Sequence, residues 1–203
     1  MKAFAAFWKG YSYCIVKMFI NQFAIAIFGL TLAIATGKTG NFNLELICSI
    51  FAVLFYLFLI YTMIWEVGAT DKVRVDAGRA VASPLRGLYM SLLANIPNMI
   101  LALLICVSFP FAGTQEWAGN TCAFAKFIAL LLEGMYTGLL SLEVGGAQLN
   151  TYPWAYVVII LPALAVSALS YYAGLRNFRI LGLFGLNYDQ KKPTGTNPGK
   201  PKK

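Results

Sequence analysis

Five apolar runs, separated by short polar segments, dominate this chain. Each run has roughly the 20 residues that an α-helix needs to cross about 30 Å of hydrocarbon. Apolar and polar positions do not alternate along them, which disfavours a β-barrel. The pattern therefore predicts membrane-spanning helices. The runs cover about residues 18–36, 44–65, 86–107, 122–142 and 154–174.

The third run contains a polar interruption. Asn95 and Asn98 flank Pro97, and a proline inside a helix removes a backbone hydrogen-bond donor. We therefore predict a kink at this point. Ser83 and Pro84 precede the run and predict its start, because serine is a good N-cap and proline suits the first helical position.

Composition agrees with a membrane protein and indicates no enzyme. Of 203 residues, 59% are hydrophobic and 12% charged, whereas about a quarter of a soluble domain is charged. The chain has no histidine and its four cysteines form no CxxC pair, so neither a disulfide framework nor a metal site is indicated. No phosphate loop or nucleophile–base pair is recognisable either. We expect no catalytic residue and no cofactor.

The basic residues predict how the protein faces the membrane, because Lys and Arg near span ends stay in the cytoplasm. Three clusters hold all of them except Lys38 and Lys126: Lys2, Lys9 and Lys17; Lys72, Arg74, Arg79 and Arg86; Arg176, Arg179, Lys191, Lys192, Lys200, Lys202 and Lys203. Five full spans would put the last cluster outside. We therefore expect four full spans, with both termini in the cytoplasm and residues 122–142 re-entrant or interfacial on the outer side. The alternative is that 122–142 spans fully.

The predicted fold is an all-α integral membrane helical bundle. It has four full transmembrane helices, one re-entrant or interfacial helix and an N-terminal interfacial helix. Residues 1–17 mix aromatic and basic side chains and predict the N-terminal interfacial helix. Residues 18–174 form the transmembrane domain. Residues 175–203 form a basic cytoplasmic tail that we expect to be disordered from about residue 189, where nothing remains to bury.

The net charge of +8 is explained by attraction to anionic lipid headgroups. The basic residues flank apolar spans, and no soluble domain remains to hold a nucleic-acid fold. We therefore expect a lipid bilayer as the partner and no nucleic acid.

Glu133, Asn95 and Asn98 form a candidate polar site within the membrane. Ionisable residues at membrane depth are functional hypotheses by default, and the two asparagines could line a cavity beside the kink. The alternative for Glu133 is a helix on the outer surface, with its charge and that of Lys126 in water, which the charge pattern favours. The alternative for the asparagines, and more strongly for Asn21 and Gln22, is hydrogen bonding between helices.

Asp71, Arg74, Asp76 and Arg79 form two acid–base pairs, each three residues apart, in the charged segment 66–87. On a helix each pair would lie on one face and add a few tenths of a kcal/mol. These residues are a candidate cytoplasmic docking loop for a protein partner. The alternative is a solvated loop that only sets the topology.

Small residues indicate close helix packing. Gly134 and Gly138 have the spacing that permits helices to approach closely. The last run also carries a series of small residues that suggests tight packing against a neighbour, within this chain or in a partner. These residues are Ala163, Ala165, Ser167, Ala168 and Ser170.

The chain resembles a group of uncharacterised multi-pass membrane proteins from low-GC Gram-positive bacteria. The most specific part of the resemblance is the D-x-x-R-x-D-x-G-R segment followed by the N-I-P span. The matching segments are NQFAIAIFGLTLAIAT (21–36), WEVGATDKVRVDAGR (65–79), PLRGLYMSLLANIPNMILALL (84–104) and YYAGLRNFRI (171–180). The resemblance implies a bacterial plasma membrane and assigns no role to any residue.

Our leading hypothesis from the sequence is a non-catalytic membrane component or accessory subunit of a larger complex. The second is a small transporter or channel built around Glu133, Asn95 and Asn98. An intramembrane enzyme is the third and least favoured.

Overall fold

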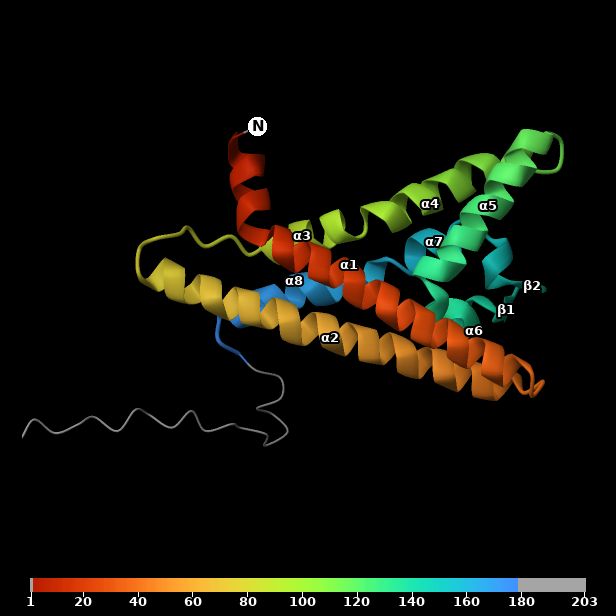
Figure 1. Cartoon of the computed structure of the whole chain (residues 1–203), viewed down its shortest axis with the longest axis horizontal. Helices are drawn as coiled ribbons and strands as arrows, with labels where there is room; N and C mark the ends of the chain where they lie inside the picture. Colours follow the sequence, from red (N-terminus) through yellow and green to blue (C-terminus); the bar gives the residue numbers. More distant parts are fainter. Residues whose placement is uncertain (1, 179–203) are drawn as a thin grey trace, which may run out of the picture.

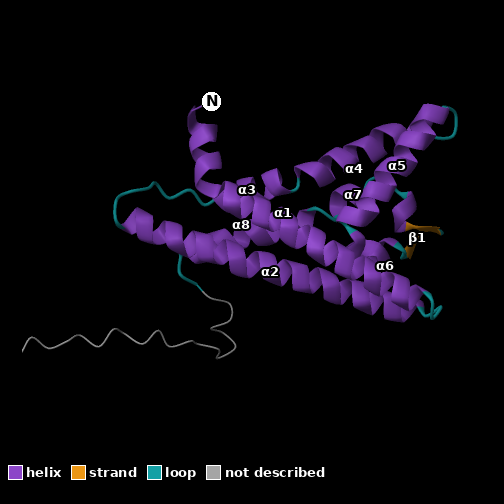
Figure 2. Cartoon of the chain, viewed as in Figure 1, coloured by secondary structure: helices purple, strands orange, loops and turns teal. Residues whose placement is uncertain are grey.

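The computed structural model describes residues 2–178, and most of them are helical (Figures 1 and 2). The longer helices are α1 (Lys2–Gly37), α2 (Phe42–Asp76), α3 (Arg86–Ala94), α4 (Ile96–Ser108), α5 (Glu116–Leu132) and α8 (Leu161–Leu175). The short elements are η1 (Phe109–Phe111), η2 (Gly134–Tyr136), α6 (Thr137–Leu140), β1 (Glu143–Val144), β2 (Ala147–Gln148), η3 (Leu149–Thr151) and α7 (Ala155–Val158). Strands β1 and β2 pair antiparallel in a small hairpin.

Three helical segments of the described chain are long and apolar enough to cross a membrane: Phe4–Gly37, Phe42–Asp76 and Ala155–Leu175. Two further helix pairs qualify only as bent units, α3 with α4–η1 and α5 with η2–α6. The protein is thus all-α with three to five candidate spans, which confirms the predicted class of helical membrane protein.

The described residues of the three basic clusters lie at one end of the molecule, here called the basic end. The N-terminus, the loop 77–85 and the end of α8 lie together there, whereas the turn 38–41, the α4–α5 turn and the β1–β2 hairpin lie at the opposite end (Figure 1). Arg176 is the last basic residue that the structure describes. The predicted tail lies outside the described residues from 179 onward, including the part expected to be disordered.

Helix α1 runs without interruption across the predicted boundary at residues 17 and 18. Its first turns nevertheless bend steeply away from the remainder (Figure 1). The N-terminal segment is therefore helical as predicted. Its placement at a membrane interface stays a prediction.

Helix α2 extends well beyond the predicted span and contains residues 66–76, which we expected in a loop. The reason is tertiary packing, because Gly68 and Asp71 of this segment are buried. The third span begins at Arg86, as predicted from the apolar run, but Ser83 is not its N-cap and Pro84 is not in its first turn. The Ser83 carbonyl instead accepts a turn hydrogen bond from the Arg86 amide.

The predicted kink in the third span is confirmed. Helices α3 and α4 meet at Asn95 with a bend of 61°, and Pro97 lies in the first turn of α4. Proline has no N–H to continue the helical hydrogen-bond pattern across the junction. Asn95 is the C-cap of α3, and its backbone amide donates to the Ser91 carbonyl.

Residues 122–142 are not a straight helix. Helix α5 ends at Leu132, and the chain turns by 90° into η2 and α6. From α6 it leads to the β1–β2 hairpin, at the same end of the molecule from which α5 began (Figure 1).

Glycines allow the close contacts that build this bundle. A Cβ on Gly174 of α8 would lie 2.3 Å from the Trp65 carbonyl oxygen, and one on Gly68 of α2 would lie 2.4 Å from the Tyr171 carbonyl oxygen. Gly134 and Gly138 likewise contact α1 and α2, which confirms the close approach predicted for them. The main core lies between α1, α2, α3 and α8 and includes Met18, Tyr56, Ile60, Ile64, Met90 and Tyr171.

Candidate functional site

Glu133 occupies the break between α5 and η2. Its side chain is 4% exposed, so the predicted position at the outer surface, in water, is wrong. The burial follows from the next residue, because Gly134 lets the chain pack directly against the Ala26 carbonyl of α1. Tertiary packing thus draws the carboxylate inward at the end of an otherwise apolar helix.

The structure brings together the three residues of the predicted polar site. Asn95, Asn98 and Glu133 surround one small interior gap, too small to hold a water molecule, where the break between α3 and α4 faces the break between α5 and η2. The other polar residues around this gap are Gln22, Tyr56 and Tyr136. We call these six residues the polar core.

Hydrogen bonds order one side of the polar core. The Asn98 side-chain amide donates to Asn95 Oδ1 at 3.0 Å, and the Asn95 amide donates to the Ser91 carbonyl at 2.9 Å. Asn98 Oδ1 and the Tyr136 hydroxyl are buried without a partner among the described residues. An unpaired buried polar group lowers folding stability by about 1–3 kcal/mol. The fold therefore tolerates two destabilising polar atoms in the polar core.

Gln22 and Tyr56 complete the polar core from α1 and α2. The Gln22 amide donates to the Leu132 carbonyl, and the Tyr56 hydroxyl donates to Gln22 Oε1, both at 3.3 Å. For Gln22, the predicted hydrogen bonding between helices is confirmed. Tyr56 gave no signal in the sequence, because it lies in an apolar run rich in aromatic residues.

A larger pocket of about 350 Å³ also adjoins Glu133. Its lining comes from α5, α6, η3 and α7: Lys126, Ala129, Leu130, Glu133, Thr137, Leu140, Ser141, Asn150 and Tyr156. We call it the Glu133 pocket. Glu133 lines both this pocket and the polar core, so its carboxylate lies at the junction between an accessible space and the buried interior.

Lys126 is held at the wall of the Glu133 pocket. Its ammonium donates to the Asn150 carbonyl at 3.0 Å and lies 5.8 Å from the ring centre of Phe109 and 5.9 Å from that of Tyr156. Within the described chain, no ion pair joins Lys126 to Glu133, in agreement with the two-turn spacing. The pocket therefore contains one cationic and one anionic side chain that do not neutralise each other directly.

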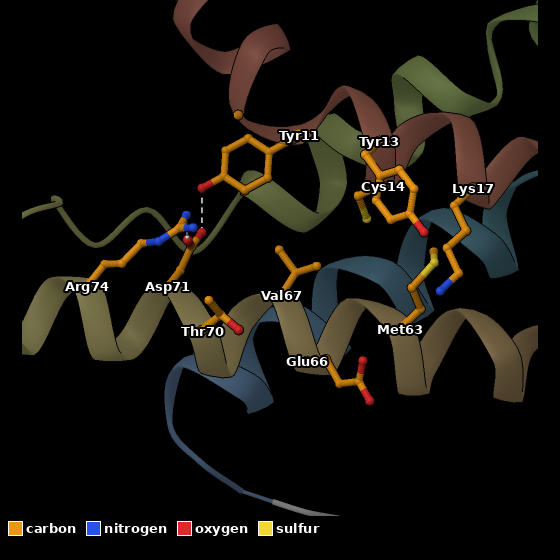
Figure 3. Close-up of a pocket in the computed structure, with 11 residues that line it drawn as sticks. Tyr11, Tyr13, Cys14, Lys17, Met63, Glu66, Val67, Thr70, Asp71 and Arg74 are labelled. Carbon is orange, nitrogen blue, oxygen red and sulfur yellow. Dashed lines mark hydrogen bonds and ion pairs between the residues drawn. The ribbon is translucent and has the colours of Figure 1, made fainter.

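A second buried carboxylate, Asp71, lies at the basic end and is 1% exposed. It accepts hydrogen bonds from the Tyr11 hydroxyl at 2.5 Å and the Tyr171 hydroxyl at 2.7 Å, and ion pairs with Arg74 at 3.1 Å and Arg86 at 3.2 Å. Figure 3 shows Tyr11 reaching across from α1 to Asp71 and Arg74 on α2. The donors come from α1, α2, α3 and α8, so this cluster joins four helices.

The predicted docking loop needs correction at Asp71, which is buried and cannot contact a partner. Its predicted pair with Arg74 is confirmed. Arg74, Asp76 and Arg79 are exposed, but Asp76 pairs with Lys72 at 3.8 Å rather than with Arg79.

A smaller pocket of about 280 Å³ adjoins Asp71 between α1 and α2 (Figure 3).

Among residues 2–178, no group of three or more His, Cys, Asp or Glu side chains could hold a metal ion. Comparisons with protein-family models, curated proteins and solved structures find no match to this chain. The geometry around Glu133 is therefore the strongest indication of function.

Proposed function

We propose that this protein is a small transporter that moves a charged solute across a membrane through a site at Glu133. The observation that carries this proposal is a buried carboxylate at a helix break, shared between an accessible pocket and a polar core. Ionisable residues at membrane depth mark substrate or ion pathways. Interrupted helices supply the polar groups for solute sites in many transporters.

We further propose four membrane crossings, formed by α1, α2, the bent α3–α4 unit and the α7–α8 segment. The α5–η2–α6 unit then enters from the outer side and returns to it. The arrangement is supported by the grouping of basic residues at one end, which would face the cytoplasm. Both termini would be cytoplasmic, and the membrane would be a bacterial plasma membrane, as the resemblance implies.

A non-catalytic accessory subunit is the second candidate. The small residues of the last run give it less support than the sequence indicated. Ala163, Ser167 and Ser170 of α8 are buried within the chain itself, so they are not available to a partner. What favours it is the exposure of Arg74 and Asp76 at the basic end, which would suit a cytoplasmic or membrane protein partner.

The transport proposal predicts that Glu133→Gln abolishes uptake. The substitution keeps the shape of the side chain and removes its charge, so uptake should fall at least about tenfold, the loss expected from one interaction of about 1.4 kcal/mol. The measurement is uptake of labelled amino acids and small amines into proteoliposomes containing the full chain.

Glu143→Gln is the matched control, because Glu143 is exposed on β1 and its variant should retain uptake. Equal uptake by the Glu133→Gln and wild-type proteins would contradict the proposal. Wild-type uptake no higher than that of empty liposomes would favour the accessory subunit instead.

The proposed topology predicts the labelling of single cysteines in a variant that lacks the four native ones. In intact cells, an impermeant maleimide should modify Thr114→Cys, which lies in the exposed α4–α5 turn, but not Ala77→Cys at the basic end. Ala77→Cys should react only after the cells are opened. Labelling of both variants from outside would disprove the arrangement. Native Cys122 is unsuited to this test because it is buried.

A further inference from the structure

The Glu133 pocket contains two separated opposite charges, one on α5 and one just after its last residue. Lys126 and Glu133 are seven residues apart, which places their backbones about 10 Å apart along α5 at 1.5 Å per residue. Both side chains line the same pocket, and no ion pair connects them in the described part of the chain. A buried charge is costly unless it is paired, and Glu133 is buried while Lys126 is partly buried, so a ligand that pairs with both would be favoured.

Lys126 is preset to receive an anion. An ammonium has three donors, and the Asn150 carbonyl takes one of them at 3.0 Å. The faces of Phe109 and Tyr156 hold the charge in place, an arrangement that stabilises cations. Two donors remain for the oxygens of a ligand carboxylate.

Glu133 is preset to receive a cation. Its side chain is 4% exposed and makes no hydrogen bond to another described residue, although its backbone amide donates to the Ala129 carbonyl at 2.7 Å. A carboxylate is an acceptor only, so its natural partner is a group with several N–H donors. The hydroxyl oxygens of Thr137 and Ser141 line the same pocket and can accept further hydrogen bonds from that group.

From this geometry we infer that the Glu133 pocket binds a small zwitterion, with its ammonium at Glu133 and its carboxylate at Lys126. A simple cation would pair with Glu133 but leave Lys126 unpaired and repelled, and a simple anion would have the reverse problem. A molecule with both charges satisfies both side chains and enters without net charge. The volume of about 350 Å³ lies at the lower end of the roughly 300–1,000 Å³ typical of small-molecule sites.

The inference deepens the proposed transport function and rests on it only for movement of the ligand, because binding is measured separately. The probes are labelled glycine, β-alanine and γ-aminobutyrate, whose charges are separated by increasing distances. Butyrate and butylammonium each carry one of the two charges and serve as controls. Binding is measured by equilibrium dialysis on the purified full chain in detergent.

At least one zwitterion should bind the wild-type protein at least about tenfold more tightly than butyrate or butylammonium, which each lose one of the two charge interactions. Glu133→Gln and Lys126→Met should each weaken zwitterion binding by a similar factor. Lys126→Arg should retain it because the positive charge is kept, which separates loss of charge from loss of fold. Glu143→Gln should bind like the wild type.

Three outcomes would overturn the inference: no zwitterion binds, butylammonium binds as tightly as every zwitterion, or Lys126→Met binds normally. Zwitterion binding without uptake into proteoliposomes would defeat the transport function and leave the binding site standing. Uptake of amines without zwitterion binding would overturn the zwitterion site and leave the transport function standing.

Discussion

Replacing Asp71 with alanine should lower the free energy of unfolding by about 3–5 kcal/mol, the usual cost of breaking a buried ion pair by removing one partner. Asp71 is 1% exposed and is the common acceptor for two tyrosine hydroxyls and two arginines. Without it, Arg86, which is only partly exposed, loses its ion-pair partner. The hydroxyl of Tyr171 loses its acceptor in the core.

The effect should be large because the cluster joins helices that are distant in the sequence. Tyr11 is 60 residues from Asp71 and Tyr171 is 100 residues from it, so the loss loosens the basic end as a whole. Asp71→Asn keeps the size of the side chain but removes its charge and should be intermediate. Tyr171→Phe removes one neutral donor and should cost about 1 kcal/mol.

Asp76→Ala is the matched control for Asp71. Asp76 lies five residues further along α2, its side chain is 64% exposed, and its only described ion pair is with Lys72 at 3.8 Å. Exposed pairs contribute about 0–1 kcal/mol, so this variant should unfold almost like the wild type. The measurement is reversible unfolding in mixed detergent micelles. Equal stability of the Asp71 and Asp76 variants would show that the cluster does not hold the four helices together.

Enlarging Gly174 or Gly68 should also destabilise the fold strongly. A Cβ at Gly174 would lie 2.3 Å from the Trp65 carbonyl oxygen and 2.9 Å from the Ala69 nitrogen, and both atoms belong to the backbone of α2. Backbone atoms cannot rotate away as a side chain can, so α2 and α8 must separate. We expect Gly174→Ala and Gly68→Ala each to lower the free energy of unfolding by about 1–3 kcal/mol, the usual cost of overpacking.

Gly10→Ala provides the comparison, because it makes the same substitution in helix α1 at a position where a Cβ meets nothing within 4 Å. Alanine is favoured over glycine in a helix by up to about 1 kcal/mol, so this variant should be as stable as the wild type or slightly more so. Thermal unfolding of the three variants under identical detergent conditions measures the difference. If Gly174→Ala matches Gly10→Ala, the contact between α2 and α8 is looser than the structure has it.

Several features of the fold could be predicted because they depend on neighbouring residues. Apolar runs of sufficient length identified the candidate spans, and Pro97 located the bend between α3 and α4. The spacing of Gly134 and Gly138 indicated close packing, and both glycines contact other helices. Each of these properties is encoded within one continuous stretch of the chain.

The helix ends were less predictable. The charges in 66–76 suggested a loop, but this segment continues α2 because its inner face packs against α8. Ser83 and Pro84 have the composition of a helix start, yet α3 begins at Arg86. In the segment 66–76, contacts with α8 outweighed the local preference of the residues.

The sequence by itself determined the class of this protein, the grouping of its basic residues and the candidates for its polar site. Only the tertiary structure decided that Glu133 and Asp71 are buried and that Glu133 and Asn98 belong to the same polar core. The physical reason is that the surroundings of a charged side chain depend on which helices pack around it. That packing is set by the 90° turn at Glu133 and by glycine contacts between helices far apart in the chain.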